Sequence, residues 1–234
     1  MIEMNTLKAV LFDLDGLIAD TEALHVSSYH KMADYLGIKL KNDYIHSFIG
    51  VATKDNVNRI IKDFKIDKRP EEVLKLRYRY YLDEIRNSEL KPMEGAEEAI
   101  LFLRKLGLKT ALVTSSIKDQ AVEVLKKIFP NYISSLDRNF GITIFDLMIF
   151  GDEVSHPKPD PEIYLKASVK LNVKPNHCVV FEDSEAGVLA AKSAGMYVIA
   201  VPNYHTKNQN FAKADYIIES LKKMPELFQT YKTL

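Results

Sequence analysis

The fold of this protein is decided by the stretch KAVLFDLDG, residues 8–16 of a 234-residue chain. An apolar run from Ala9 to Phe12 ends abruptly at two aspartates and a glycine. Because an uninterrupted apolar run of this length is typical of a strand buried on both faces, it predicts the first strand of a parallel sheet. Asp13 and Asp15 then stand where that strand ends.

The same pattern of short apolar runs recurs along the chain and predicts further strands. They cover residues 110–113, 178–181, 197–201 and 216–218, with 145–150 as a further candidate after a loop-like stretch at 131–144. Helical periodicity lies between the strands, at residues 96–106, 119–128, 161–171 and 185–194. Alternating strands and helices predict an α/β fold with a Rossmann-like parallel sheet and right-handed crossovers.

One region, residues 21–91, breaks this alternation because it shows helical periodicity and heavy charge but no convincing strand. The predicted helices of this region cover residues 21–36, 54–64 and 70–87. A helical block between the first strand and the next crossover helix is typical of an inserted subdomain. We therefore expect a core domain of residues 1–20 and 92–234, and an inserted α-helical cap of residues 21–91.

The charge of the chain is balanced, with 32 basic and 32 acidic residues. Proteins that bind nucleic acids or membrane surfaces usually carry a basic excess, so neither partner is expected, and Arg77 and Arg79 are interpreted as part of a helix surface.

No apolar run is long enough to span a bilayer and no signal-peptide pattern is present, which predicts a cytoplasmic protein. The single cysteine, Cys178, lies in an apolar run and is predicted to be a buried structural thiol.

Polar residues with complementary chemistry follow several of the predicted strands. They are Asp13 and Asp15; Thr114, Ser115 and Ser116; Lys158; and Glu182, Asp183 and Ser184. Since an open parallel sheet binds ligands at the carboxyl ends of its strands, these groups are expected to form one site. Crowded carboxylates repel one another and need a cation, and hard oxygen ligands suit Mg²⁺. The hydroxyls and the lysine would hold a dianionic phosphate.

Each of these groups alone has an ordinary structural explanation, because Asp, Ser and Gly favour turns and helix caps. Their coincidence at one edge of the sheet has no such explanation. A carboxylate that faces phosphorus can act as a nucleophile, and a second one nearby can protonate the leaving oxygen and later activate water. The pattern therefore predicts phosphoryl transfer through Asp13, with Asp15 as the proton donor and acceptor.

Taken together, these residues resemble the four motifs of the haloacid dehalogenase superfamily, over roughly residues 8–201. The helical insert is similar to the cap of the subgroup that contains beta-phosphoglucomutase and many sugar-phosphate phosphatases. The resemblance implies that Asp13 is the nucleophile and a Mg²⁺ ligand, and that Asp15 is the general acid and base, with its carbonyl on the metal. It also implies a phosphate site made of Thr114, Ser115 and Lys158, and a substrate contact at His25. Glu182 and Asp183 would be further metal ligands.

The acid at position 15 argues against a dehalogenase, because halide leaves without a proton. The mutase-like members of the subgroup place a lysine and an arginine around the cap loop where this chain has Ile49 and Thr53, although Lys54 is adjacent and His25 does match them. The predicted function is a Mg²⁺-dependent phosphatase that acts on a small phosphorylated metabolite. A sugar phosphomutase and a non-catalytic phosphate-binding protein are the alternatives. A monomer is expected, because no interface stripe is evident.

Overall fold

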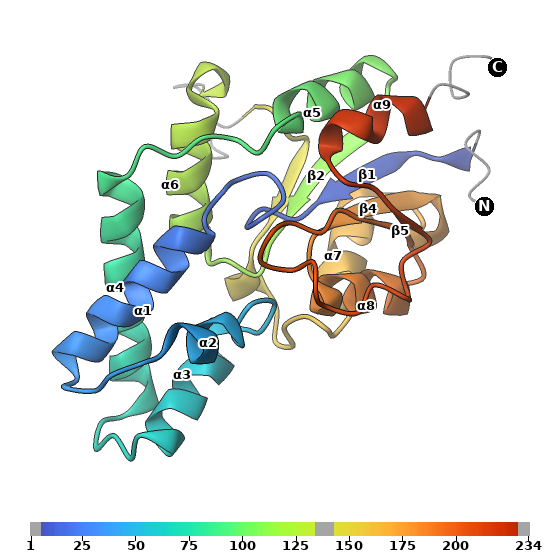
Figure 1. Ribbon diagram of the computed structural model, residues 1–234. Helices are drawn as coiled ribbons and strands as arrows, with labels where there is room; N and C mark the ends of the chain where they lie inside the picture. The colour runs from blue at the N-terminus through green and yellow to red at the C-terminus, as the bar shows by residue number, and fades with distance from the viewer. Residues whose placement is uncertain (1–5, 134–142, 229–234) are drawn as a thin grey trace.

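The computed structural model describes residues 6–133 and 143–228 (Figure 1). Within them lies a six-stranded sheet with the order β3-β2-β1-β4-β5-β6, in which every neighbouring pair is parallel. The strands are β1 Ala9–Phe12, β2 Lys109–Val113, β3 Leu147–Ile149, β4 Cys178–Glu182, β5 Tyr197–Ala200 and β6 Tyr216–Ile217. The predicted Rossmann-like sheet is confirmed, and so is the candidate strand near residue 147. Most of the loop-like stretch at 131–144 lies outside the described residues.

Helices cover both faces of the sheet, as Figure 1 shows. They are α5 Ala96–Lys105, α6 Lys118–Ile128, α7 Glu162–Leu171, α8 Glu185–Ser193 and α9 Met224–Leu227. Side chains of β1 alternate between the two faces: Val10 and Phe12 pack into the cluster that contains residues of α5 and α6, and Ala9 and Leu11 pack into the cluster that contains residues of α7 and α8. Because both faces are covered, the central strands are apolar throughout, which is the pattern that the sequence shows.

The remaining helices gather beside the carboxyl end of the sheet (Figure 1). They are α1 Glu22–Tyr35, α2 Asn42–His46, α3 Thr53–Asp63 and α4 Pro70–Asn87, and they share a hydrophobic cluster that contains Tyr29, Phe48 and Ile60. The short helix α2 was not predicted, because five residues are too few to show helical periodicity. The exact limits of the core and cap domains, 21–91 for the cap, stay a prediction.

None of the described helices combines the length and the hydrophobicity that crossing a bilayer requires.

Cys178 lies in β4 with no exposed surface, and burial raises the pKa of its thiol to about 12. Because the thiolate is the reactive form, and it appears only as the pH approaches this raised pKa, the native protein is expected to be inert to Ellman's reagent at pH 8. In guanidinium chloride one thiol per chain should react. Absorbance at 412 nm measures both reactions, and native labelling as fast as that of the unfolded chain would contradict the buried position.

Candidate active site

The carboxyl ends of β1, β2 and β4 meet the cap helices at a cavity of about 110 Å³. The parallel register sets Phe12 beside both Leu112 and Phe181, so the residues that follow these strands come out side by side. The cavity is lined by most of the predicted site residues, which are Asp13, Asp15, His25, Thr114, Ser115, Lys158 and Asp183. Glu182 does not line the cavity; it is fully buried behind Lys158.

Lys158 joins the first and last of the predicted motifs. Its Nζ donates to Asp13 Oδ1 at 2.7 Å, to Glu182 Oε1 at 2.6 Å and to the carbonyl oxygen of Val113 at 3.2 Å. An ammonium has three hydrogens to donate, and all three have an acceptor here. Tyr164 adds a hydroxyl that donates to Glu182 Oε1 at 2.5 Å. The lysine is therefore held between two carboxylates and cannot neutralise a third.

Three buried carboxylates, those of Asp13, Glu182 and Asp183, bring oxygens within 4.8 Å of one another. Burial raises the pKa of Asp13 to about 7, even though Lys158 lowers it. Burial and the neighbouring Asp13 and Glu182 hold the pKa of Asp183 well above its usual range. Both shifts come first from burial and then from neighbouring carboxylates whose negative charge the single lysine does not fully compensate. The set fits a divalent cation that prefers oxygen ligands.

Asp15 lies across from this cluster and accepts several hydrogen bonds. The donors are Ser116 Oγ at 2.6 Å, Thr21 Oγ1 at 2.7 Å, Tyr81 Oη at 3.2 Å, His25 Nε2 at 3.4 Å and Thr114 Oγ1 at 3.5 Å. Burial by itself raises the pKa of Asp15, but the bonds from His25, Ser116 and Thr21 bring it below its usual range. Asp15 is therefore ionised in this arrangement.

Ser116 is a contact that the sequence reasoning missed, because it singled out Thr114 and Ser115 from the three hydroxyls after β2. Ser115 and Ser116 both line the cavity, and of these two serines it is Ser116 whose hydroxyl donates to Asp15. The Ser116 N–H also donates to Thr114 Oγ1 at 3.0 Å. The order of hydroxyls along the chain carries no signal for this choice, since the turn after the strand decides which side chain faces Asp15.

The interpretation of Arg77 as part of a helix surface is wrong, since this side chain is only 1% exposed. Its guanidinium lies 4.2 Å from the ring centroid of Tyr29 and 4.9 Å from that of Tyr81, and its Nη2 donates to His25 Nδ1 at 2.8 Å. Because Nδ1 accepts, the ring hydrogen lies on Nε2, which faces Asp15. A stripe at four-residue spacing, Val73, Arg77, Tyr81 and Ile85, is buried along α4 and is the signal that would have found Arg77.

Asn203 was also missed, since it follows β5 well beyond the last motif. Its Nδ2 donates to Asp183 Oδ2 at 2.8 Å and to the carbonyl oxygen of Gly16 at 3.0 Å. Gly16 has a φ of 77°, and a Cβ there would lie 2.5 Å from Asp183 Oδ2. The glycine after Asp15 is therefore required both by its backbone conformation and by the close approach of the Asp183 carboxylate.

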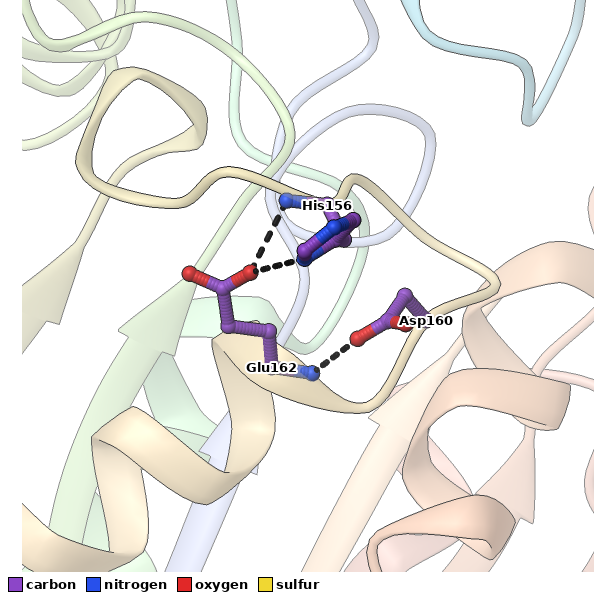
Figure 2. A group of neighbouring side chains, drawn as sticks. All are labelled: His156, Asp160 and Glu162. Atoms are coloured by element: carbon purple, nitrogen blue, oxygen red, sulfur yellow. Dashed lines mark hydrogen bonds and ion pairs between the residues drawn. The ribbon is translucent and has the colours of Figure 1, made fainter.

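A second group of polar side chains consists of His156, Asp160 and Glu162 (Figure 2). The first two lie on the loop before α7, and Glu162 is the first residue of that helix. The Glu162 carboxylate accepts from His156 Nδ1 at 2.9 Å and from the backbone N–H groups of Ser155 and His156 at 2.9 and 2.8 Å. Asp160 Oδ1 accepts from the N–H of Glu162 at 2.9 Å, at the start of α7. These hydrogen bonds fix the conformation of the loop before α7. Lys158, on the same loop, lines the cavity.

Comparison with known proteins places this geometry in a family. Residues 10–201 match the model of the haloacid dehalogenase-like hydrolases. The phosphorylated carbohydrates phosphatase of Thermotoga maritima is 36% identical over 190 residues, which is 81% of this chain and 82% of that protein. The validoxylamine A 7'-phosphate phosphatase of Streptomyces hygroscopicus is 28% identical over 214 residues, 92% of this chain and 94% of that protein.

Solved structures share the fold. The beta-phosphoglucomutase of Clostridium difficile is 25% identical, covers 96% of this chain and 97% of its own, and has a TM-score of 0.78. The CbbY protein of Rhodobacter sphaeroides, solved with phosphate, has a TM-score of 0.80 at 24% identity and supports the fold alone; 93% of this chain and 96% of that chain are covered. The matches confirm the predicted fold class, the resemblance to this superfamily and the predicted class of enzyme, a phosphatase.

Proposed function

Because the chain belongs to the haloacid dehalogenase-like hydrolase family, we propose that it hydrolyses a small phosphate monoester by passing the phosphoryl group through Asp13. The observation that carries this proposal is the meeting of Asp13, Asp15 and Lys158 at one cavity. Two carboxylates and a cation are what transfer of a phosphoryl group to an aspartate requires. The 36% identical relative that is named a phosphorylated carbohydrates phosphatase supports a substrate of that size and chemistry.

The reaction has two steps. An oxygen of Asp13 attacks phosphorus while the bond to the leaving alcohol breaks, and Asp15 gives its proton to the leaving oxygen. Water then attacks the phosphorus of the aspartyl phosphate while Asp15 takes a proton from that water. The bond between phosphorus and the Asp13 oxygen breaks, which releases phosphate and free Asp13. The ionised Asp15 of the resting site is ready for the second step. The arrival of a phosphate dianion beside Asp15 raises its pKa and favours the protonated form that the first step needs.

Mg²⁺ is the proposed cofactor, held by the carboxylates of Asp13 and Asp183 and by the carbonyl oxygen of Asp15. When bound, it would neutralise and orient the transferring phosphate. Glu182 stays a predicted ligand, but in this arrangement Oε1 already accepts from Lys158 and Tyr164, and Oε2 accepts from Ser184 Oγ at 3.1 Å. Its clearest contribution is to hold Lys158 against Asp13.

The cap loop favours water over a second sugar phosphate as the acceptor. Ile49 and Thr53 line the cavity, whereas Lys54 is exposed and does not. Among the described lining residues the basic side chains are Lys158 and His25, so a second phosphate would have no cation of its own. His25 beside Asp15 is the observation that keeps a phosphomutase as the second candidate. A mutase would need a bisphosphate activator and would conserve total ester phosphate.

A non-catalytic phosphate-binding protein, the third alternative, is disfavoured by the complete set of carboxylates at the cavity. Cytoplasmic location and a monomeric state are proposed on the sequence reasoning alone.

The test is hydrolysis of p-nitrophenyl phosphate by the whole chain with and without metal. Mg²⁺ should support release of p-nitrophenol, EDTA should abolish it, and excess Mg²⁺ should restore it. A screen of sugar, polyol and nucleoside monophosphates, read as released phosphate, then identifies the preferred ester. No release from any of these compounds with Mg²⁺, Mn²⁺ or Co²⁺ would overturn the proposed function.

A further inference from the structure

Glu22, the first residue of α1, places a carboxylate at the cavity. The proposed reaction assigns no role to this carboxylate. Its residue is 8% exposed and lines the cavity. Within residues 6–133 and 143–228, its carboxylate makes no hydrogen bond or ion pair. The other buried carboxylates of the site differ, because Asp13 and Glu182 accept from Lys158, and Asp183 accepts from Asn203.

The Glu22 residue is largely buried and its carboxylate has no donor from the described residues, although its oxygens are not closed off from solvent completely. Burial raises the pKa of Glu22, opposed by His25 and reinforced by Asp15. Buried polar atoms in native proteins are nearly always hydrogen bonded, and an unmet acceptor is destabilising. The first turn of a helix favours negative charge, which explains the tolerance of an acid here. This preference of the helix for negative charge does not supply a hydrogen-bond donor to the Glu22 side chain. Since Glu22 borders the cavity, its carboxylate is open to water, or to a donor on the ligand that displaces this water.

The position of Glu22 on α1 indicates which part of the ligand it meets. Glu22 and His25 are three residues apart and lie on the same face of the helix. His25 Nε2 lies 3.4 Å from Asp15, the residue that protonates the leaving oxygen. The carbon next to that oxygen therefore lies close to this face, and substituents on the following carbons come within reach of Glu22.

The chemistry of the walls decides between a hydroxyl and an ammonium as the donor. The cap side of the cavity is mostly apolar, with Val26, Tyr29, Ile45, Phe48 and Ile49 among its residues. Burying an ammonium there carries a heavy desolvation cost, whereas a hydroxyl is moved from water at a much smaller one. The two oxygens of one carboxylate also suit two neighbouring hydroxyls.

On this basis, and resting on the proposed function, we infer that Glu22 is a specificity-determining residue that accepts hydrogen bonds from hydroxyl groups of the leaving alcohol. Nothing else in the reaction requires it. Esters that carry hydroxyls near the phosphate gain this contact, and deoxygenated esters of the same shape leave Glu22 unpaired. Discrimination of this kind is strong, because the penalty falls on the substrate that fails to satisfy a buried polar group.

The experiment compares matched esters that differ only in hydroxyls: glycerol 3-phosphate against propyl phosphate, and ribose 5-phosphate against its 2-deoxy analogue. We expect the wild-type enzyme to favour the hydroxylated member of at least one pair in kcat/KM. Glu22→Gln and Glu22→Ala should reduce that preference by about tenfold or more, because a hydrogen bond to a charged group is lost. Asp34→Asn, which removes one charge from the exposed side of the same helix, is the matched control and should leave the preference unchanged.

Five outcomes would overturn the inference. An equal loss of kcat/KM for both members of each pair would make Glu22 structural, and a changed Mg²⁺ requirement with an unchanged preference would assign it to the metal. A wild-type preference for phosphoethanolamine over these esters that disappears in Glu22→Gln would make the donor an ammonium. If the wild-type enzyme hydrolyses p-nitrophenyl phosphate but shows no preference within either pair, the inference fails while the proposed function stands. Inactivity toward every ester overturns both.

Discussion

Asp13→Asn is expected to lower kcat for every phosphate ester by at least about three orders of magnitude, the scale seen when a catalytic nucleophile is removed. The amide cannot form the aspartyl phosphate, and it presents no negative charge to a metal ion. Lys158 loses an ionic partner at 2.7 Å but keeps Glu182 at 2.6 Å. Steady-state hydrolysis of p-nitrophenyl phosphate at saturating Mg²⁺ measures the effect.

The melting temperature of the folded protein is the control for this variant. The pKa of Asp13 is raised from 3.8 to about 7, so the folded protein binds this proton more tightly than the unfolded chain does. Ionisation of Asp13 therefore costs stability as pH rises from about 4 to 7, and removing the group should not lower the melting temperature of the metal-free protein at pH 8. Activity of Asp13→Asn within tenfold of wild type would show that the phosphoryl group takes another route.

Lys158→Met is expected to damage both stability and activity. It leaves Asp13, Glu182 and Asp183 without the cation that contacts two of them. Breaking a buried ion pair from one side costs about 3–5 kcal/mol, so the free energy of unfolding of the metal-free protein should fall by roughly that amount. Urea unfolding measures this loss, and kcat should fall together with it because Asp13 loses the ammonium that contacts it at 2.7 Å.

The loss in free energy of unfolding caused by Lys158→Met should grow as the pH increases. Without the lysine the pKa values of Asp13 and Asp183 rise further, so their ionisation opposes folding above about pH 4, the unfolded value, and the loss of stability grows as the pH increases. Lys126→Met is the matched control. Lys126 is exposed on α6 and pairs with Glu123, and its loss should change stability by about 0.5 kcal/mol or less. Equal effects of the two variants would mean that the Lys158 pairs do not stabilise the fold.

Much of the site was predictable because its residues follow strands. Asp13, Thr114 and Asp183 each come one or two residues after a buried apolar run, and parallel pairing in register brings those positions to one edge. Lys158 was predictable in part, since it stands in a loop before a helix and not at a strand end. Its partners, Asp13 and Glu182, emerge only from the folded chain.

Other contacts depend on how distant elements pack. A charged residue on a helix is usually solvated, so Arg77 was interpreted in that way; packing of α4 against α1 places it between Tyr29 and Tyr81. Asn203 reaches Asp183 only because the chain after β5 turns back over the loop that holds Gly16. The stripe of four-residue spacing along α4 could have marked Arg77 as buried. No local pattern marks Asn203, because its partners Gly16 and Asp183 lie elsewhere in the chain.

The sequence by itself determined the parallel sheet, the helical insert after the first strand, and the nucleophile with its neighbouring acid, because hydrophobic periodicity and strand-end chemistry are local properties. Only the tertiary structure decided that Ser116 and not Ser115 bonds to Asp15, that Arg77 orients His25, and that Glu22 faces the cavity without a donor. Each of these depends on side-chain contacts between elements that are separate in sequence, and packing alone sets such contacts.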